Sequence, residues 1–125
     1  MSKTAIVVCS DPASGSDEAL GRLFNALFLA YELMEKKKEV AIVYQGAGAR
    51  WPAELRQTTH PAHILFTAVS ALETSICGGC ADVFGATSDA RKTGIRLDYQ
   101  KAMPGTPGIL DLSDYLDRGF SLVIF

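Results

Sequence analysis

The chain has 125 residues, of which 48% are apolar and 21% are charged, values typical of a folded globular protein. This length suits one domain that buries a core without disulfide or metal crosslinks. The net charge of −2 and the lack of a Lys/Arg stripe argue against a nucleic-acid partner. No apolar run of about 18 residues occurs, so we expect no membrane-spanning helix and no membrane partner.

The first third of the chain has the pattern of a strand, a loop and a long helix. Thr4–Cys9 is a β-branched apolar run, typical of a buried strand in a parallel sheet. Ser10–Ser16 is rich in Ser, Asp, Pro and Gly, which indicates a loop. Apolar residues then recur at helical spacing over Asp17–Lys37, which predicts the longest helix, with Ser16 or Asp17 as its N-cap.

The middle of the chain repeats this alternation. Glu39–Tyr44 predicts a second buried strand, and Gln45–Ala49 predicts a glycine-bearing turn. Trp51–Thr58 predicts a short helix. His60–His63 predicts the start of another helix, because proline is tolerated in a first turn. Glu73–Cys77 predicts a short third strand.

The last third has shorter elements. Ala81–Gly85 predicts a short helix, and Thr87–Leu97 predicts a short helix followed by extended chain. The Pro and Gly residues of Met103–Gly108 exclude a sheet interior and indicate a loop. Asp111–Arg118 predicts a helix that a glycine ends, and Phe120–Phe125 predicts a final buried strand.

This order of elements predicts the fold class. Strands that alternate with helices form an α/β fold with a mostly parallel sheet of about four to five strands. Right-handed crossovers place helices on both faces, which gives three layers. We find no linker, internal repeat or change of composition, so residues 1–125 are expected to form a single domain.

Candidate functional residues lie where the predicted strands end. In open parallel sheets, ligands and chemistry gather beyond the carboxyl ends of the strands. Three segments are expected at this edge: Cys9 and Ser10; Gln45, Gly46 and Gly48; and Cys77, Gly78, Gly79 and Cys80.

Cys77 is the strongest candidate for a nucleophile. It would lie between a strand and a helix, where backbone N–H groups lower a thiol pKa below its usual value of about 8.5. The two glycines after it would let the turn bend tightly and let a sulfur partner approach the backbone. Cys80 is spaced to resolve a mixed disulfide or to bond to Cys77 directly. Glu73 and Asp82 act in the opposite direction, since nearby negative charge raises a thiol pKa.

The cysteines also allow other interpretations. Cys77 and Cys80 could be small buried apolar residues, and Cys9 could be either a third reactive thiol or a core residue. His60 and His63, together with Cys77 and Cys80, offer four zinc ligands in two pairs. Histidines at a helix start usually cap it or face water, so we predict no metal site.

Two glycine-containing turns support a different class of function. The Asp11–Ser16 loop precedes a helix N-terminus, and Gly46 and Gly48 flank Ala47; each turn could hold a small anion or nucleotide. Neither has the pattern of a P-loop or of a dinucleotide fingerprint. A non-enzymatic binding module therefore remains an alternative, and so do plain turns.

The sequence resembles the DsrE/DsrF-like family, which includes TusD-type sulfur-relay proteins with a YchN-like fold. The resemblance follows the order of segments over nearly the whole chain. Thr4–Cys9 leads through Ser10-Asp11-Pro12 into a long helix, and Val40–Tyr44 ends in a glycine turn. Cys77 follows the third strand, and Leu112–Phe125 closes the chain with a short helix and a strand. A second cysteine, Cys80, departs from the pattern of the sulfur-relay members.

The resemblance implies a role in intracellular sulfur transfer. Cys77 matches the cysteine that carries persulfide in the sulfur-relay members, so the expected covalent state is persulfide sulfur on Cys77, with no separate cofactor. Sulfur-donor and sulfur-acceptor proteins and assembly as a homotrimer or homohexamer are implied as well. The alternative to sulfur transfer is thiol–disulfide redox chemistry by Cys77 and Cys80. The N-terminal residues lack the pattern of a signal peptide, so we expect a cytoplasmic location.

Overall fold

The computed structural model describes residues 2–125. Within them, five strands form one sheet of order β4-β3-β2-β1-β5, and every neighbouring pair is parallel. The predicted α/β class with a parallel sheet is confirmed. The strands are β1 (Lys3–Val8), β2 (Glu39–Tyr44), β3 (Glu73–Cys77), β4 (Arg96–Asp98) and β5 (Phe120–Ile124).

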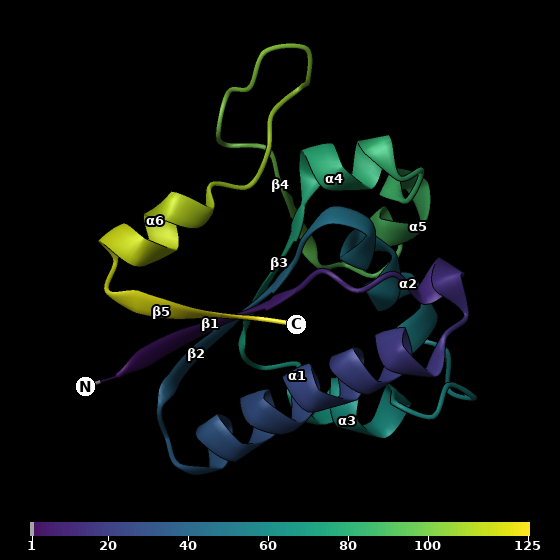
Figure 1. Ribbon diagram of the computed structural model, residues 1–125, viewed down its shortest axis with the longest axis vertical. Coiled ribbons are helices and arrows are strands. Elements are labelled where there is room, and N and C mark those ends of the chain that lie inside the picture. Colours follow the sequence, from purple (N-terminus) through teal and green to yellow (C-terminus); the bar gives the residue numbers. More distant parts are fainter. Residues whose placement is uncertain (1) are drawn as a thin grey trace.

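Helices lie on both sides of this sheet. Figure 1 shows α1 and α3 below the sheet and α6 on the opposite side. The α-helices in the described part are α1 (Asp17–Glu35), α2 (Trp51–Leu55), α3 (His63–Ala68), α4 (Gly78–Val83), α5 (Thr87–Arg91) and α6 (Leu112–Asp117). Two 3-10 helices, η1 (Pro12–Ser14) and η2 (Gly46–Arg50), follow the ends of β1 and β2.

The central strands are buried on both faces, which is why they read as continuous apolar runs. One set of side chains packs against α1 and the other helices below the sheet: Ile6, Val8, Ile42, Tyr44 and Ile76. The alternate set packs against α6 and the segment before it: Ala5, Val7, Ala41, Val43 and Cys77. Because successive strand residues point to opposite faces, Cys77 lies on the α6 side of the sheet.

The connections bring the site segments to one edge. The chain steps from β1 to β2, β3 and β4 in one direction, and then returns to place β5 on the other side of β1. All strands run the same way, so the ends of β1, β2 and β3 meet at one edge of the sheet. The segments after Val8, Tyr44 and Cys77 therefore share that edge, as expected from the sequence.

Several element boundaries differ from the predictions. The long helix ends at Glu35, because Lys37 adopts a left-handed conformation with φ of 58°. The helix predicted from His60 starts only at His63, since the His60 ring accepts a hydrogen bond from the Ala62 N–H in a local turn. The prediction of Ser16 as the N-cap of α1 is confirmed by its bond from the Ala19 N–H.

The prediction that the final strand is buried is wrong for this chain. β5 pairs only with β1 and forms an edge of the sheet. Phe120 is buried, but Ile124 is 63% exposed. The apolar composition of Phe120–Phe125 suggested burial, but an edge strand has a neighbouring strand on one side only, which leaves part of it exposed.

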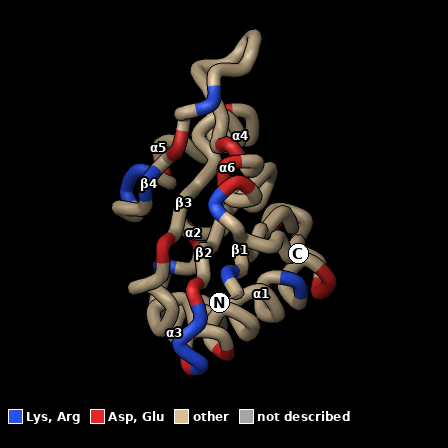
Figure 2. The backbone as a smooth tube through the Cα atoms, turned by 90° about the vertical axis from the view of Figure 1, so that its left-hand side faces the viewer, with Lys and Arg blue, Asp and Glu red and all other residues tan. Residues whose placement is uncertain are grey.

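Charged residues are spread along the backbone. In Figure 2 the Lys and Arg positions alternate with Asp and Glu positions, and the loop that rises above α4 and α6 is almost free of charge. Of the residues 2–125, none belongs to a helix that combines the length and apolarity needed to cross a membrane.

Candidate functional site

The carboxyl edge of the sheet is closely packed at η2. Gly48 lies against the end of β1, where a methyl group would overlap the Val8 carbonyl oxygen and lie 3.3 Å from the Cys9 Cα. Gly46 has φ of 58°, a conformation that favours glycine. η2 in turn packs against α4. The glycine turn therefore serves to bring the Cys9 end of β1 and the Cys77–Cys80 segment together.

α4 begins directly at the end of β3. Cys77 is its N-cap, and the Cys77 Sγ accepts a hydrogen bond from the Cys80 N–H at 3.4 Å. The predicted start at Ala81 is wrong by three residues, because the glycines have low helix propensity and hid the first turn. Capping by a cysteine sulfur instead of a hydroxyl or carboxylate gave no sequence signal.

Gly78 and Gly79 are required for space. The chain passes from β3 to α4 with no residue between them, and neither glycine needs a positive φ to do so. A methyl group at Gly78 would lie 2.5 Å from the Tyr99 ring. A methyl group at Gly79 would lie 2.5 Å from the Gly108 carbonyl oxygen. We call Tyr99–Leu110 the cover segment, since it lies over the first turn of α4.

The cover segment also contacts the Cys77 sulfur. The Leu110 N–H donates to the Cys77 Sγ at 3.5 Å, from 33 residues further along the chain. The side chain of Cys77 is fully buried. The hydrogen bond from the Cys80 thiol and those from the backbone N–H groups of Leu110, Cys80 and Gly79 lower the pKa of Cys77 to about 6, against the opposing effect of burial. These N–H groups therefore favour the thiolate form of Cys77.

The carboxylates of Glu73 and Asp82 are both engaged with other side chains. Glu73 lies at the opposite end of β3 and pairs with Arg118 at 2.9 Å. The Asp82 carboxylate accepts hydrogen bonds from the hydroxyls of Thr87 and Tyr99. Neither carboxylate is hydrogen-bonded to the Cys77 sulfur, which accepts from the N–H groups of Cys80 and Leu110.

Cys80 and Cys9 differ from Cys77 in acidity and exposure. Cys80 is partly exposed, and its thiol pKa is raised, first by its hydrogen bond to Cys77 and then by burial, while the Gly46 N–H opposes the shift. Cys9 is exposed, and partial burial raises its pKa. The charge of Cys9 also raises the pKa of Cys80, so the two thiols share one edge. All three cysteines are free.

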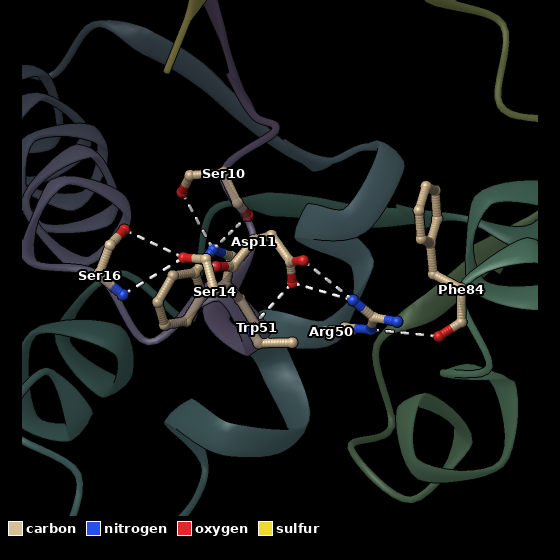
Figure 3. A network of polar contacts seen from close by, with 8 residues as sticks. Ser10, Asp11, Ser14, Ser16, Arg50, Trp51 and Phe84 are labelled. Carbon is tan, nitrogen blue, oxygen red and sulfur yellow. Dashed lines mark hydrogen bonds and ion pairs between the residues drawn. The ribbon is translucent and has the colours of Figure 1, made fainter.

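An ion pair that the sequence did not reveal connects the loops of this edge (Figure 3). The Arg50 guanidinium donates to both Asp11 carboxylate oxygens at 3.0 and 3.1 Å and to the Phe84 carbonyl oxygen at 3.1 Å. Arg50 follows the glycine turn, and Phe84 caps the end of α4. No local pattern could indicate this link, because Asp11 and Arg50 are 39 residues apart.

Ser10, predicted as a site residue, has a structural role in the same network. The Trp51 indole N–H donates to the Ser10 carbonyl oxygen at 2.8 Å and to its hydroxyl at 3.2 Å. The Ser10 hydroxyl donates to the Ala19 carbonyl oxygen at 3.1 Å. Ser10 thus anchors the loop after β1 to α1 and α2.

The four candidate zinc ligands do not meet. The His60 Nδ1 accepts from the Ala62 N–H, and the His63 Nδ1 lies 2.8 Å from the Leu55 carbonyl oxygen. Both histidines belong to the segment around α3, away from Cys77 and Cys80. Over residues 2–125, no group of three or more His, Cys, Asp and Glu side chains is placed to hold a metal ion.

The glycine turn is not arranged as a ligand cradle. The β1 backbone occupies the space beside Gly48, and the Gln45 Oε1 is buried without a hydrogen-bond partner within the described chain.

A groove of about 450 Å³ lies beside Cys9 and the Asp11–Ser16 loop. A second groove, of about 590 Å³, lies between α2 and α5 and includes Arg50.

Comparison with known proteins identifies one similar sequence and no activity. No family model matches the chain, and no solved structure matches it. The chain is 28% identical over 101 residues to uncharacterized protein MJ0733 of Methanocaldococcus jannaschii. The matched part covers 81% of this chain and 78% of the archaeal protein. This similarity carries no information on substrate or reaction.

Proposed function

We propose that this protein transfers sulfane sulfur, with Cys77 as the sulfur-carrying residue. The observation that carries the proposal is the set of donors on one sulfur. The backbone N–H groups of Cys80 and Leu110 both donate to the Cys77 Sγ. A sulfur held in this way is nucleophilic when free and leaves readily as a thiolate when bonded.

The chemistry is a transfer of neutral sulfur between thiolates. In the net reaction, the Cys77 thiolate receives the outer sulfur of a hydropersulfide donor, R–S–SH. The donor S–S bond breaks, and its electron pair leaves on R–S⁻. The product is Cys77–S–SH. An acceptor thiolate then attacks the outer sulfur, and Cys77 returns as a thiolate, a good leaving group because of its low pKa.

The resemblance to the DsrE/DsrF-like family supports the same assignment. Its sulfur-relay members carry persulfide at the position of Cys77, after a central strand. Under this proposal the donor and the acceptor are partner proteins in the same compartment, the cytoplasm. The additional Cys80 is a feature of this chain that the family pattern does not include.

Mass spectrometry tests the proposal directly. The reduced protein is incubated with a low-molecular-weight hydropersulfide, and the gain of one sulfur atom is mapped by peptide fragmentation. We expect the added sulfur on Cys77 in the wild type and in Cys9→Ser, and none in Cys77→Ser. Addition that stays unchanged in Cys77→Ser would contradict the assignment of Cys77 as carrier.

A second candidate function is thiol–disulfide exchange by Cys77 and Cys80. The supporting observation is that both cysteines lie in the first turn of α4, where the Cys80 N–H donates to the Cys77 Sγ at 3.4 Å. Oxidation by a low-molecular-weight disulfide would join the two sulfurs and release two thiols. Titration against glutathione buffers measures the reduction potential of the pair. A pair that oxidises only when the protein unfolds would exclude this function.

We further propose that the chain assembles into a homotrimer or homohexamer. The uncovered edge strand β5 and the exposed Ile124 support this proposal, because an apolar strand with one free edge is a ready pairing surface. The resemblance to the DsrE/DsrF-like family supports it as well.

A further inference from the structure

The two cysteines of the Cys77–Cys80 segment differ in how external molecules reach them. Cys77 has 0% of its surface exposed. Leu110 contacts its sulfur, and Gly108 and Ile109 close over Gly79. Cys80 lies one helical turn further along α4 and is partly exposed. Cys80 is therefore the more accessible of the two to a sulfur compound in solution, whereas such a compound reaches Cys77 only if the cover segment moves away.

We propose that Cys80, and not Cys77, forms the covalent bond with the external sulfur compound. The buried Cys77 assists this reaction as a base and then takes the sulfur from Cys80. This inference rests on the proposed function, because it concerns how sulfur enters the same pair. It assigns Cys80 as the entry residue, and the substrate class is a small hydropersulfide or disulfide. Cys77 first accepts a proton from Cys80 and then accepts the sulfur.

The placement of the two cysteines supplies the proton path. The Cys80 N–H donates to the Cys77 Sγ at 3.4 Å, so the first turn of α4 holds the two side chains side by side. As the Cys80 sulfur attacks the outer sulfur of R–S–SH, its proton moves to Cys77, the donor S–S bond breaks and R–S⁻ leaves. The products are Cys80–S–SH and Cys77–SH. In this step Cys77 serves as the general base that Cys80 needs, since a thiol with a raised pKa is rarely ionised.

The second step moves the sulfur inward. The Cys77 sulfur attacks the outer sulfur of Cys80–S–SH, the bond between that sulfur and Cys80 breaks, and the Cys77 proton passes to the Cys80 sulfur. The products are Cys77–S–SH and Cys80–SH, so atoms and electrons balance without an oxidant. The adjacent sulfurs make this an intramolecular transfer, which needs no second encounter.

Cys80 is also the cysteine that meets the external molecule if the pair forms a disulfide. An external thiolate would attack the Cys80 sulfur, which is the accessible one, and Cys77 would leave as the more stable thiolate. A mixed disulfide with a small thiol would therefore form on Cys80. The Cys-x-x-Cys spacing had favoured Cys77, the residue at the helix start, as the one that meets the substrate.

Glutathione disulfide is a probe that reports which cysteine is attacked. Cys9→Ser/Cys77→Ser and Cys9→Ser/Cys80→Ser leave a single cysteine each, and circular dichroism and a thermal melt check that both fold. Because Cys77→Ser removes the proposed base, both variants are compared at about pH 9, where an ordinary thiol ionises without one, and we expect the first variant to gain one glutathionyl group in native buffer. We expect the second to react about tenfold more slowly or not at all, and to react fully in urea.

Equal rates for the two variants in native buffer would overturn the inference, because Cys77 would then be directly accessible. The hydropersulfide assay on the single variant Cys80→Ser provides a second measurement. Loading of Cys77 in Cys80→Ser at the wild-type rate would also overturn the inference, while the proposed function would stand. If the wild type takes up no sulfur, the proposed function fails, and the glutathione comparison still decides whether Cys80 is the reactive entry thiol.

Discussion

At the level of single residues, the acidity of Cys77 comes from two sources that are far apart in the chain. One is local, since the first turn of α4 directs N–H groups at its N-cap. The other is the Leu110 N–H, which only the return of the chain over α4 supplies. The local source was predictable from a cysteine between a strand and a helix. The distant source and the thiol of Cys80 were not.

The lowered pKa of Cys77 predicts a pH dependence of stability. Between about pH 6 and the usual thiol pKa of about 8.5, unfolded Cys77 is protonated while folded Cys77 is ionised. The unfolded state then binds more protons, so the free energy of unfolding rises with pH, by at most about 1.4 kcal/mol per unit. This stabilisation is lost as the pH falls through 6.

Urea unfolding of the wild type and Cys77→Ser at several values from pH 5 to 8 measures this effect. We expect the difference in free energy of unfolding between the two proteins to grow in favour of the wild type as the pH rises. Cys9→Ser is the control and should follow the wild type over this range. A difference that stays constant with pH would show that the Cys77 pKa is not lowered by folding.

At the level of elements, the packing of the cover segment on α4 depends on two glycines. Gly79→Ala would place a methyl group 2.5 Å from the Gly108 carbonyl oxygen and 2.7 Å from the Ile109 Cγ2. We expect a loss of about 1–3 kcal/mol in free energy of unfolding, because the clash exceeds the gain in helix propensity. We also expect faster alkylation of Cys77, since the cover segment is displaced.

Gly21→Ala in α1 is the matched control. No atom lies within 4 Å of the added methyl group, so the better helix propensity of alanine should raise the free energy of unfolding by up to about 1 kcal/mol. Denaturant unfolding and timed iodoacetamide labelling measure both variants. Gly79→Ala as stable and as slowly labelled as the wild type would contradict the packing argument.

Arg50 connects the loop after β1 and the end of α4 to η2, so replacing it should lower the free energy of unfolding. Arg50→Ala removes two hydrogen bonds to Asp11 and one to the Phe84 carbonyl oxygen. We expect the free energy of unfolding to fall by about 1–2 kcal/mol, a moderate value because the pair is partly exposed. Arg22→Ala, which breaks an ion pair with Glu18 inside α1, should cost only about 0.5 kcal/mol. Equal losses in urea unfolding would mean that the link between the loops adds nothing.

At the level of the whole molecule, the sheet has one edge strand that is apolar and uncovered. β5 lies beside β1 and has no neighbour on its other side within the described residues. In the proposed oligomer this strand is buried against another copy of the chain. α6 packs against β5 and buries Phe120, whereas the exposed side chains of β5 include Ile124.

Ile124→Lys tests whether this strand mediates self-association. We expect the wild type to sediment as a trimer or hexamer, and Ile124→Lys to dissociate at least about tenfold more readily, which is about 1.4 kcal/mol. The monomer should remain folded, because Ile124 is 63% exposed. Ile64→Lys on α3 is the control, with a side chain that is 84% exposed. A monomeric wild type, or equal dissociation of both variants, would disprove the role of β5.

The sequence by itself determined the α/β class, the order of elements and the edge where the cysteines meet. Glu39–Tyr44 and Glu73–Cys77 were predicted with their observed bounds. Glu39–Tyr44 has the nearly continuous apolar run of a buried strand, and Glu73–Cys77 is a short segment directly before two glycines. The parallel direction followed from the helices between them. These features depend on local patterns, which one chain displays without its fold.

The tertiary structure alone decided which cysteine is accessible, which distant N–H group contacts Cys77 and what holds the cysteines in place. The Leu110 N–H, the contact of Gly79 with Gly108 and the pair of Asp11 with Arg50 join residues about 30 or more positions apart. Such contacts leave no periodic or local signal. The exposure of Cys80 and the burial of Cys77 likewise follow from where the cover segment lies, and this arrangement makes Cys80 the proposed entry to the site.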